Sequence, residues 1–219
     1  DADRGTLGGV LVRDVQVSAD GVICHTLPAP LSPGAVVRGE VDAAVRLERM
    51  QCHSGEHLVS GAVYAQYGFH NVGFHLGDED VTLDFDGVLT REQLNGIEDT
   101  VNRYIRACLP VRAFYPAPEE LATLQYRAKL ALTENVRIVE IGDGDLLCDR
   151  CACCAPHVRN TGEIGSAGRL RSVRSDACRP RTRNCATALR PCAGRCRICA
   201  PLPCPRRTGT FACLRRDWT

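Results

Sequence analysis

The stretch His53-Ser54-Gly55-Glu56-His57 is the part of the sequence on which the fold prediction depends. Around it, the apolar residues recur at the spacing of one helical face, and Gly68 follows as a stop signal, so a helix is predicted from about Glu48 to Tyr67. Two histidines at positions i and i+4 project from one side of a helix and can bind one metal ion together. The alternative is that both histidines simply lie on a solvated helix face.

A second pair with the same separation lies about a hundred residues later, in Cys153-Cys154-Ala155-Pro156-His157. A thiolate from Cys153 and an imidazole from His157 would complete a tetrahedral site with His53 and His57. Sulfur and imidazole ligands favour Zn²⁺ over Mg²⁺ or Ca²⁺, which prefer oxygen. Spacing alone leaves three other cysteines open as the sulfur ligand: Cys148, Cys151 and Cys154.

The remaining patterns mix strands with helices. A helix is predicted from the N-cap Thr90, with Gln93 three residues later, to about Cys108. A short helix is predicted at Pro118 to Leu124. Predicted strands cover Gly8 to Val17, Gly21 to His25, Ala35 to Leu47, Val72 to Leu76, Val81 to Phe85, Val111 to Tyr115 and Val136 to Ile141.

These elements predict an α+β fold with an antiparallel sheet and helices on one face. We expect a small β domain at residues 1–45, a zinc-binding α+β domain at residues 46–165 and an irregular tail at residues 166–219. In the tail, Arg, Pro, Ala and Cys alternate without the period of a strand or a helix.

Composition favours a cytosolic globular protein. The 219 residues are 44% hydrophobic and 24% charged, and no apolar run approaches the ~20 residues that cross a bilayer. The chain begins without a signal-peptide pattern. Fourteen cysteines, with an early group bunched beside His157, indicate metal binding before disulfides in such a protein.

The net charge of +1 conceals an uneven distribution. From Ser166 onward there are thirteen Arg, no Lys and two acidic residues, so the remainder of the chain is acidic. That remainder offers no bulk electrostatic case for binding nucleic acid, which would therefore depend on a local patch.

Two hydrolytic functions are compatible with the predicted zinc site. Zinc lowers the pKa of bound water to roughly 7 and polarises a carbonyl, which suits hydrolysis of an ester or amide. Because four protein ligands fill a tetrahedral shell, either a ligand yields, the coordination expands or the ion positions the substrate. His53 to His57 also matches the H-x-x-E-H pattern of inverted zinc peptidases, with Glu56 as general base, although those enzymes take an acidic third ligand.

Both pairs and their surroundings together resemble the alanyl-tRNA editing proteins and the editing domain of alanyl-tRNA synthetases. The matching stretches are Met50 to His57, Cys153 to Val158 and Thr161-Gly162-Glu163-Ile164-Gly165, with Asn71 to His75, Leu83 to Phe85 and Asp3 to Leu7 as further similar segments. The resemblance covers about residues 1 to 165.

The resemblance implies a small β-barrel, truncated in this chain to residues 1–45, followed by the α+β editing domain that threonyl-tRNA synthetases share. The implied activity is translational proofreading: zinc-dependent deacylation of Ser-tRNA(Ala) or Gly-tRNA(Ala). The implied metal ligands are His53, His57, Cys153 and His157. Glu56 would orient water or cap the site, and His75 is expected to be an ordinary strand residue. No ATP-binding synthetase core is recognisable, so we expect that the chain does not charge tRNA by itself.

Two departures from the family's pattern lead to further hypotheses. The family's first strands and glycine-rich segment are missing ahead of Asp1, so a fragment is expected. Lys129 is the only lysine, which indicates GC-rich coding DNA, and we hypothesise that residues 166–219 are read out of frame. The alternatives are a disordered basic tail, or a tRNA- or zinc-binding tail that uses Cys192, Cys196 and Cys199.

Overall fold

The structure of the chain is a computed structural model, and it describes residues 3–76, 81–128, 135–168, 170 and 187–188. The chain divides into two compact units, Asp1–Met50 and Gln51–Thr219. The longest helix, α1 (Ala43–Tyr67), begins in the first unit and continues into the second. The domain limits expected from the sequence stay a prediction, and the hypotheses about the tail fall almost entirely outside the described residues.

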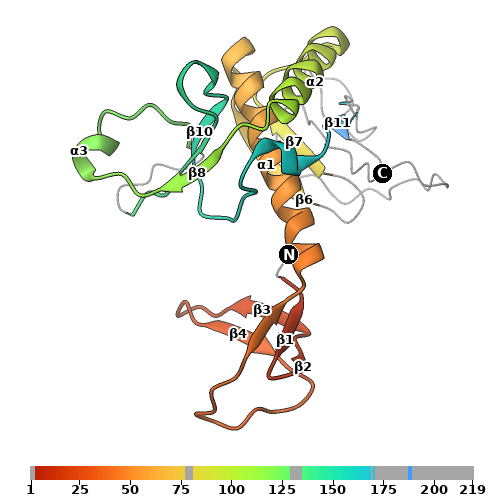
Figure 1. Ribbon diagram of the computed structural model, residues 1–219, viewed down its shortest axis with the longest axis vertical. Helices are drawn as coiled ribbons and strands as arrows, with labels where there is room; N and C mark the ends of the chain where they lie inside the picture. The colour runs from red at the N-terminus through yellow and green to blue at the C-terminus, as the bar shows by residue number, and fades with distance from the viewer. Residues whose placement is uncertain (1–2, 77–80, 129–134, 169, 171–186, 189–219) are drawn as a thin grey trace, which may run out of the picture. The chain divides into compact units, whose positions relative to one another are not determined.

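The N-terminal unit contains two small antiparallel sheets (Figure 1). One has the order β2-β1-β5 and the other pairs β3 with β4. The strands are β1 (Gly5–Leu7), β2 (Val10–Leu11), β3 (Asp14–Val17), β4 (Ile23–Thr26) and β5 (Gly39–Val41). The described residues form no closed barrel, so that expectation is wrong for them: five strands of two to four residues stay in two separate sheets, whereas a barrel requires one sheet that closes on itself.

Two strand predictions in this unit are also corrected. The single strand expected from Gly8 to Val17 begins only at Val10, because Gly8 and Gly9 adopt positive φ angles in the turn between β1 and β2, and it is divided into β2 and β3 at residues 12 and 13. The strand expected from Ala35 to Leu47 is limited to β5. The Asp42 carboxylate accepts hydrogen bonds from the backbone of Ala44 and Val45, both at 3.1 Å, and this N-cap starts α1 instead.

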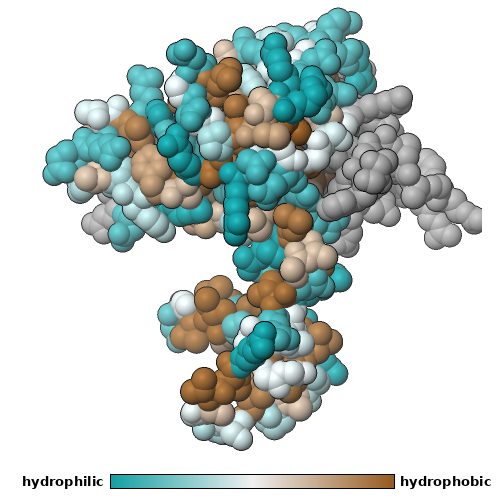
Figure 2. Space-filling model, in the orientation of Figure 1, coloured by the Kyte–Doolittle hydropathy of each residue, from teal (hydrophilic) through white to brown (hydrophobic). Residues whose placement is uncertain are grey.

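Apolar side chains lie on the surface of the N-terminal unit, where Figure 2 shows them as brown patches. They are Leu11, Val17, Val22, Ile23, Val36 and Val41, each more than half exposed. Each sheet has only two or three short strands, and none of the described residues before Gln51 is fully buried.

The second unit is built around the C-terminal two-thirds of α1 (Figure 1). Its strands are β6 (Asn71–Leu76), β7 (Val81–Phe85), β8 (Val111–Phe114), β9 (Ile138–Ile141), β10 (Asp149–Ala152) and β11 (Thr187–Ala188). They form two antiparallel sheets, ordered β11-β7-β6 and β10-β9-β8. The remaining helices are α2 (Arg91–Arg106), α3 (Pro118–Leu121) and the 3₁₀ turns η1 (Gly144–Leu146) and η2 (Thr161–Ile164).

The core joins α1, α2 and both sheets. Its fully buried side chains include Leu58 and Val63 from α1, Phe85 from β7, Ile97 from α2 and Ile141 from β9. The predicted helix after Thr90 is confirmed with its capping box: Thr90 accepts from the Gln93 backbone, and the Gln93 side chain accepts from Thr90. The mixture of helices and antiparallel sheets agrees with the predicted class. Within the described residues, none of the helices is long and apolar enough to span a membrane.

Candidate metal centre

One face of α1 carries the first half of the site. His53, Glu56, His57 and Ser60 follow the i, i+3, i+4, i+7 spacing of a single helix face. The helix is buried continuously from Ser54 to Val63, so most of this polar face points into the protein. Polar groups in such a position require partners, and the second half of the site supplies them.

Strand β10 and the loop after it carry the second half. Asp149 and Cys151 alternate inward along β10, and Cys153 follows one residue after the strand. The Arg137 guanidinium fixes this loop by donating to the carbonyl oxygens of Cys153 at 2.8 Å and Ala155 at 3.0 Å. The sequence predicts no strand in this segment, so β10 is an addition to the expected elements.

The Thr161-Gly162-Glu163-Ile164-Gly165 segment holds the loop from its other end. The Thr161 hydroxyl donates to the carbonyl of Tyr104 at 2.6 Å and accepts from the Leu109 backbone at 2.8 Å. The Gln51 side chain on α1 donates to the Glu163 carbonyl at 2.6 Å. The loop that carries His157 is therefore tied both to the end of α2 and to α1.

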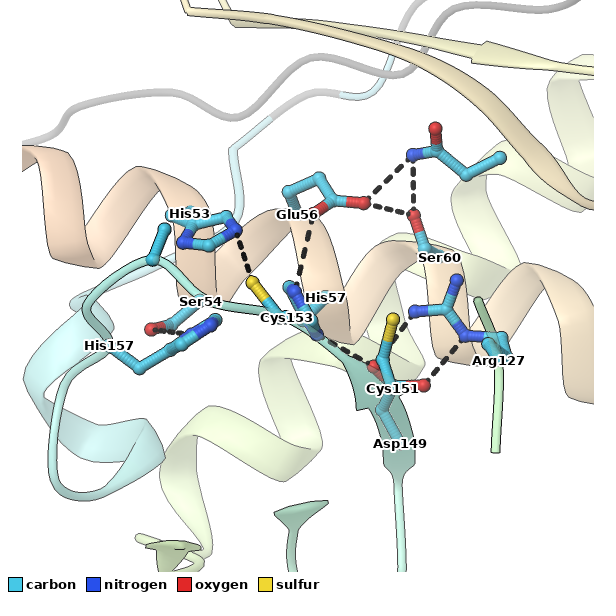
Figure 3. A network of polar contacts seen from close by, with 12 residues as sticks. His53, Ser54, Glu56, His57, Ser60, Arg127, Asp149, Cys151, Cys153 and His157 are labelled. Atoms are coloured by element: carbon cyan, nitrogen blue, oxygen red, sulfur yellow. Dashed lines mark hydrogen bonds and ion pairs between the residues drawn. The ribbon is translucent and has the colours of Figure 1, made fainter. Parts of the chain in front are cut away.

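The two halves bring together all four residues predicted as metal ligands (Figure 3). One ligand atom from each of His53, His57, Cys153 and His157 lies within 4.8 Å of the others. The Cys153 Sγ lies 3.4 Å from the His53 Nε2, and the ring centroids of His53 and His157 are 4.2 Å apart. Residues a hundred positions apart in the sequence thus form one compact set of donors.

Each of the three imidazoles uses its Nδ1 atom to contact the protein. His57 Nδ1 lies 2.9 Å from Asp149 Oδ2, and His53 Nδ1 lies 3.3 Å from the Pro156 carbonyl oxygen. Because these partners only accept, the neutral form of each imidazole carries its proton on Nδ1 and keeps a lone pair on Nε2 for a metal ion. His157 Nδ1 lies 3.0 Å from the Ser54 hydroxyl, and its Nε2 is buried without a hydrogen-bond partner. Buried polar atoms without partners are rare, and a metal ion at the centre would satisfy this one.

The pKa values distinguish the cysteines. Burial raises the pKa of the Cys153 thiol, but the neighbouring imidazoles of His157, His53 and His57 outweigh it and lower the pKa to about 3. Burial raises the pKa of both Cys148 and Cys151 to about 12. Since the thiolate is the form that binds metals, the electrostatics favour Cys153 as the sulfur ligand.

The pKa values of two of the imidazoles shift in opposite directions. Burial lowers the pKa of His157, and the neighbouring His57 and His53 add to this, so that it falls to about 4. Burial also opposes the charged form of His57, but the Glu56 and Asp149 carboxylates and Cys153 raise its pKa to about 10.

Two carboxylates flank the four donors. Glu56 Oε1 accepts from Ser60 at 2.7 Å and Asn71 at 2.8 Å, while its Oε2 lies 3.7 Å from His57 Nε2. Asp149 accepts from both sides, from His57 and from the Arg127 guanidinium. His75 is not part of the cluster; it lies exposed on β6, with its Nε2 3.6 Å from Asp84 Oδ2.

The donor set and its charge both suit a divalent, moderately soft cation. With a metal ion bound and the three histidines therefore neutral, the Cys153 thiolate and the carboxylates of Asp149 and Glu56 would contribute three negative charges, and Arg127 would contribute one positive charge. A dication would balance this group, and three imidazoles with a thiolate match zinc better than magnesium or calcium.

Sequence reasoning missed the residues that orient the donors and the two flanking carboxylates: Ser54, Ser60, Asn71, Arg127 and Asp149. Ser60 follows Glu56 by one helical turn, so the periodicity of α1 could have indicated it. Asp149 shares the inward face of β10 with Cys151, so recognition of that strand would have indicated it as well. Arg127 has no comparable local signal.

Comparisons with known proteins give the same family from two directions. The sequence profile of the family described as "Threonyl and Alanyl tRNA synthetase second additional domain" matches residues 136–168, which include Cys153 and His157. The alanine–tRNA ligase of Halorubrum lacusprofundi is 33% identical over 183 residues, which make up 78% of this chain and 19% of that protein. The chain belongs to the alanyl-tRNA editing family.

Other members of this family include alanyl-tRNA editing proteins that are not ligases by name. Aarsd1-A of Xenopus laevis is 32% identical over 164 residues, and Aarsd1 of Rattus norvegicus is 31% identical over 167 residues. Each of these matches covers 74% of this chain and 39% of the relative. The chain therefore spans less than two-fifths of the length of the curated relatives that it matches.

Proposed function

We propose that this chain hydrolyses the aminoacyl ester of mischarged tRNA, Ser-tRNA(Ala) or Gly-tRNA(Ala), with a zinc ion held by His53, His57, Cys153 and His157. The observation that carries the proposal is the convergence of three imidazoles and one thiolate within 4.8 Å, in a chain of the alanyl-tRNA editing family. Relatives named as editing proteins supply the substrate class, and tRNA is the proposed partner.

The chemistry suits the substrate. Bound zinc would act as a Lewis acid that polarises the ester carbonyl and lowers the pKa of water. The need for a second site is physical, because an aminoacylation pocket shaped for alanine rejects an added hydroxyl group poorly.

Glu56 is the proposed proton acceptor. Ser60 and Asn71 hold its Oε1, so its Oε2 is the oxygen that points toward the donor cluster, 3.7 Å from His57 Nε2. A carboxylate oriented in this way accepts the proton of a water molecule that attacks the ester carbonyl. Its burial also protects it from competing contacts with solvent.

A zinc peptidase of the H-x-x-E-H type is the competing hypothesis. It would use the same Glu56, but it takes an acidic third ligand. Here Asp149, the carboxylate nearest to His57 Nδ1, accepts from the Arg127 guanidinium, while the donors that lie beside His53 and His57 come from Cys153 and His157. Both that contact pattern and the names of the relatives favour the deacylase.

The test is a direct assay of ester hydrolysis. Purified protein is incubated with Ser-tRNA(Ala), Gly-tRNA(Ala), Ala-tRNA(Ala) and an unstructured peptide, each with and without a zinc chelator. We expect release of free tRNA from the two mischarged substrates, loss of that activity with chelator and its return on addition of zinc. Peptide cleavage without deacylation would favour the peptidase. The same preparation with alanine, ATP and uncharged tRNA is expected to form no Ala-tRNA.

A further inference from the structure

We propose that Asp149 and Arg127 form a positioning pair for the metal centre: Asp149 fixes the orientation of His57, and Arg127 fixes Asp149. The inference rests on the proposed function, because it concerns the same site. It assigns a role to two residues that lie outside the four donors and their sequence motifs.

Asp149 determines which nitrogen of His57 faces the centre. Its Oδ2 lies 2.9 Å from His57 Nδ1, and both side chains are about 3% exposed or less. A carboxylate can only accept, so the contact holds the proton on Nδ1 and leaves Nε2 for a metal. Metal-binding histidines commonly depend on a partner of this kind for both tautomer and ring orientation.

Arg127 holds Asp149 in a single orientation. Its Nε donates to Asp149 Oδ1 at 2.7 Å and its Nη2 donates to Oδ2 at 2.8 Å, so the guanidinium binds both carboxylate oxygens (Figure 3). The fork geometry of arginine makes this bidentate contact more specific than a lysine contact would be.

The backbone of Arg127 is fixed as well. Its N–H donates to the Arg150 carbonyl at 2.8 Å, and its own carbonyl accepts from the Ala152 backbone at 2.8 Å. Arg127 thereby forms a parallel bridge with Cys151 at the edge of β10. Its side chain is only 13% exposed, so the charge is anchored at the back of the site rather than in solvent.

The same contacts exclude a competing metal position. His57, Asp149 and Cys151 also bring ligand atoms within 4.8 Å of one another. A cation there would have to displace a bidentate guanidinium from Asp149. Asp149 is thus placed to orient a ligand and not to be one.

The experiment measures zinc affinity by competition with a chromophoric chelator, and it uses Co²⁺ substitution to report the thiolate charge-transfer band. The variants are Asp149→Asn, Arg127→Met, Arg127→Lys and the double variant Asp149→Asn/Arg127→Met. Glu140→Gln is the matched control, because Glu140 forms a half-buried pair with Arg150 on the same sheet without touching a donor. Unfolding of each metal-free protein is recorded in parallel.

We expect Asp149→Asn to weaken zinc binding by about 10- to 100-fold and to shift the Co²⁺ spectrum, which a loss of general stability would not do. Arg127→Met is expected to weaken it by a smaller factor, with Arg127→Lys in between. The double variant should match Asp149→Asn alone, because Arg127 acts through Asp149. Glu140→Gln should leave zinc affinity unchanged.

The outcomes separate this inference from the proposed function. Zinc-binding, deacylating wild-type protein with unchanged affinity in Asp149→Asn would overturn the pair and leave the function intact. Wild-type protein without zinc affinity would overturn both. If Asp149→Asn does not fold, the two Arg127 variants decide: wild-type affinity in both would overturn the inference.

Discussion

At the scale of single residues, the metal centre distinguishes sharply between two neighbouring cysteines, of which only one is a candidate sulfur ligand. Cys153 and Cys154 are neighbours in the chain, yet Cys153 points toward His53 Nε2 at 3.4 Å while Cys154 is exposed. Cys153 also has three imidazoles within reach to stabilise its thiolate. Adjacent side chains of the same type therefore occupy environments of opposite character.

This difference predicts opposite effects of two matched substitutions. Cys153→Ser should reduce zinc affinity by more than about 100-fold. Loss of a metal ligand weakens metal binding more than loss of a residue that hydrogen-bonds to a ligand. The substitution should also abolish deacylation. Cys154→Ser should change neither property by more than about twofold. Zinc content after dialysis and deacylation of Ser-tRNA(Ala) check both expectations, and loss of metal in Cys154→Ser but not in Cys153→Ser would contradict the ligand assignment.

At the scale of elements, the centre requires α1 to lie directly against the segment that begins β10. Gly61 permits this approach: a Cβ atom there would lie 2.5 Å from the Cys148 carbonyl oxygen and 2.9 Å from the Asp149 Cβ. Both contacts are shorter than packed atoms tolerate, and one of them is with backbone that cannot rotate away. One turn before Gly61, the same helix presents His57 to Asp149.

Gly61→Ala is therefore expected to separate α1 from β10. The predicted cost is about 1–3 kcal/mol of unfolding free energy from overpacking, together with weaker zinc binding through the His57–Asp149 contact. Gly96→Ala in α2 is the control, because a Cβ there meets nothing within 4 Å and alanine favours a helix by about 0.5–1 kcal/mol. Denaturant unfolding measures both variants. Equal stability of Gly61→Ala and wild type would show that this helix approach tolerates a methyl group.

Elements with a local signal could be predicted from the sequence, and elements fixed by distant contacts could not. The His53–His57 spacing and the Thr90 capping box are properties of a few consecutive residues, and the structure contains both as expected. Strand β10 reads Asp-Arg-Cys-Ala, which has no β-branched or aromatic residue, and it is defined by pairing with β9.

The contacts that orient the donor side chains could not be predicted from the sequence either. Asp149 lies 92 positions from His57 and 22 from Arg127, so no periodicity connects them. The start of α1 was missed for a different reason: alternation from Ala35 to Leu47 mimics a strand, and the Asp42 cap overrides it. The barrel was expected from resemblance alone, and no residue pattern in the first 45 positions required it.

At the scale of the whole molecule, the second unit folds around a cluster that is electrostatically incomplete without a cation. The side chains of Asp149 and Glu56 are each less than 5% exposed, and the Cys153 thiolate lies beside them. Like charges in a protein interior repel strongly, and without a metal ion the Arg127 guanidinium and the proton on His57, whose pKa is raised to about 10, offset them only in part. A metal that binds here and not to the unfolded chain stabilises the folded state by mass action.

Removal of metal should consequently lower the stability of the entire chain and not only its activity. At a free zinc concentration about 1,000 times the dissociation constant, binding contributes about 4 kcal/mol, which is expected to raise the melting temperature by several degrees. Thermal unfolding with chelator, with added Zn²⁺ and with added Mg²⁺ measures this, and only Zn²⁺ should restore the transition, because the donors are sulfur and nitrogen. Cys153→Ser separates this centre from zinc bound elsewhere, since its transition should no longer respond to zinc. A transition that stays in place after complete removal of metal from the wild type would mean that the four side chains meet for a reason other than metal binding.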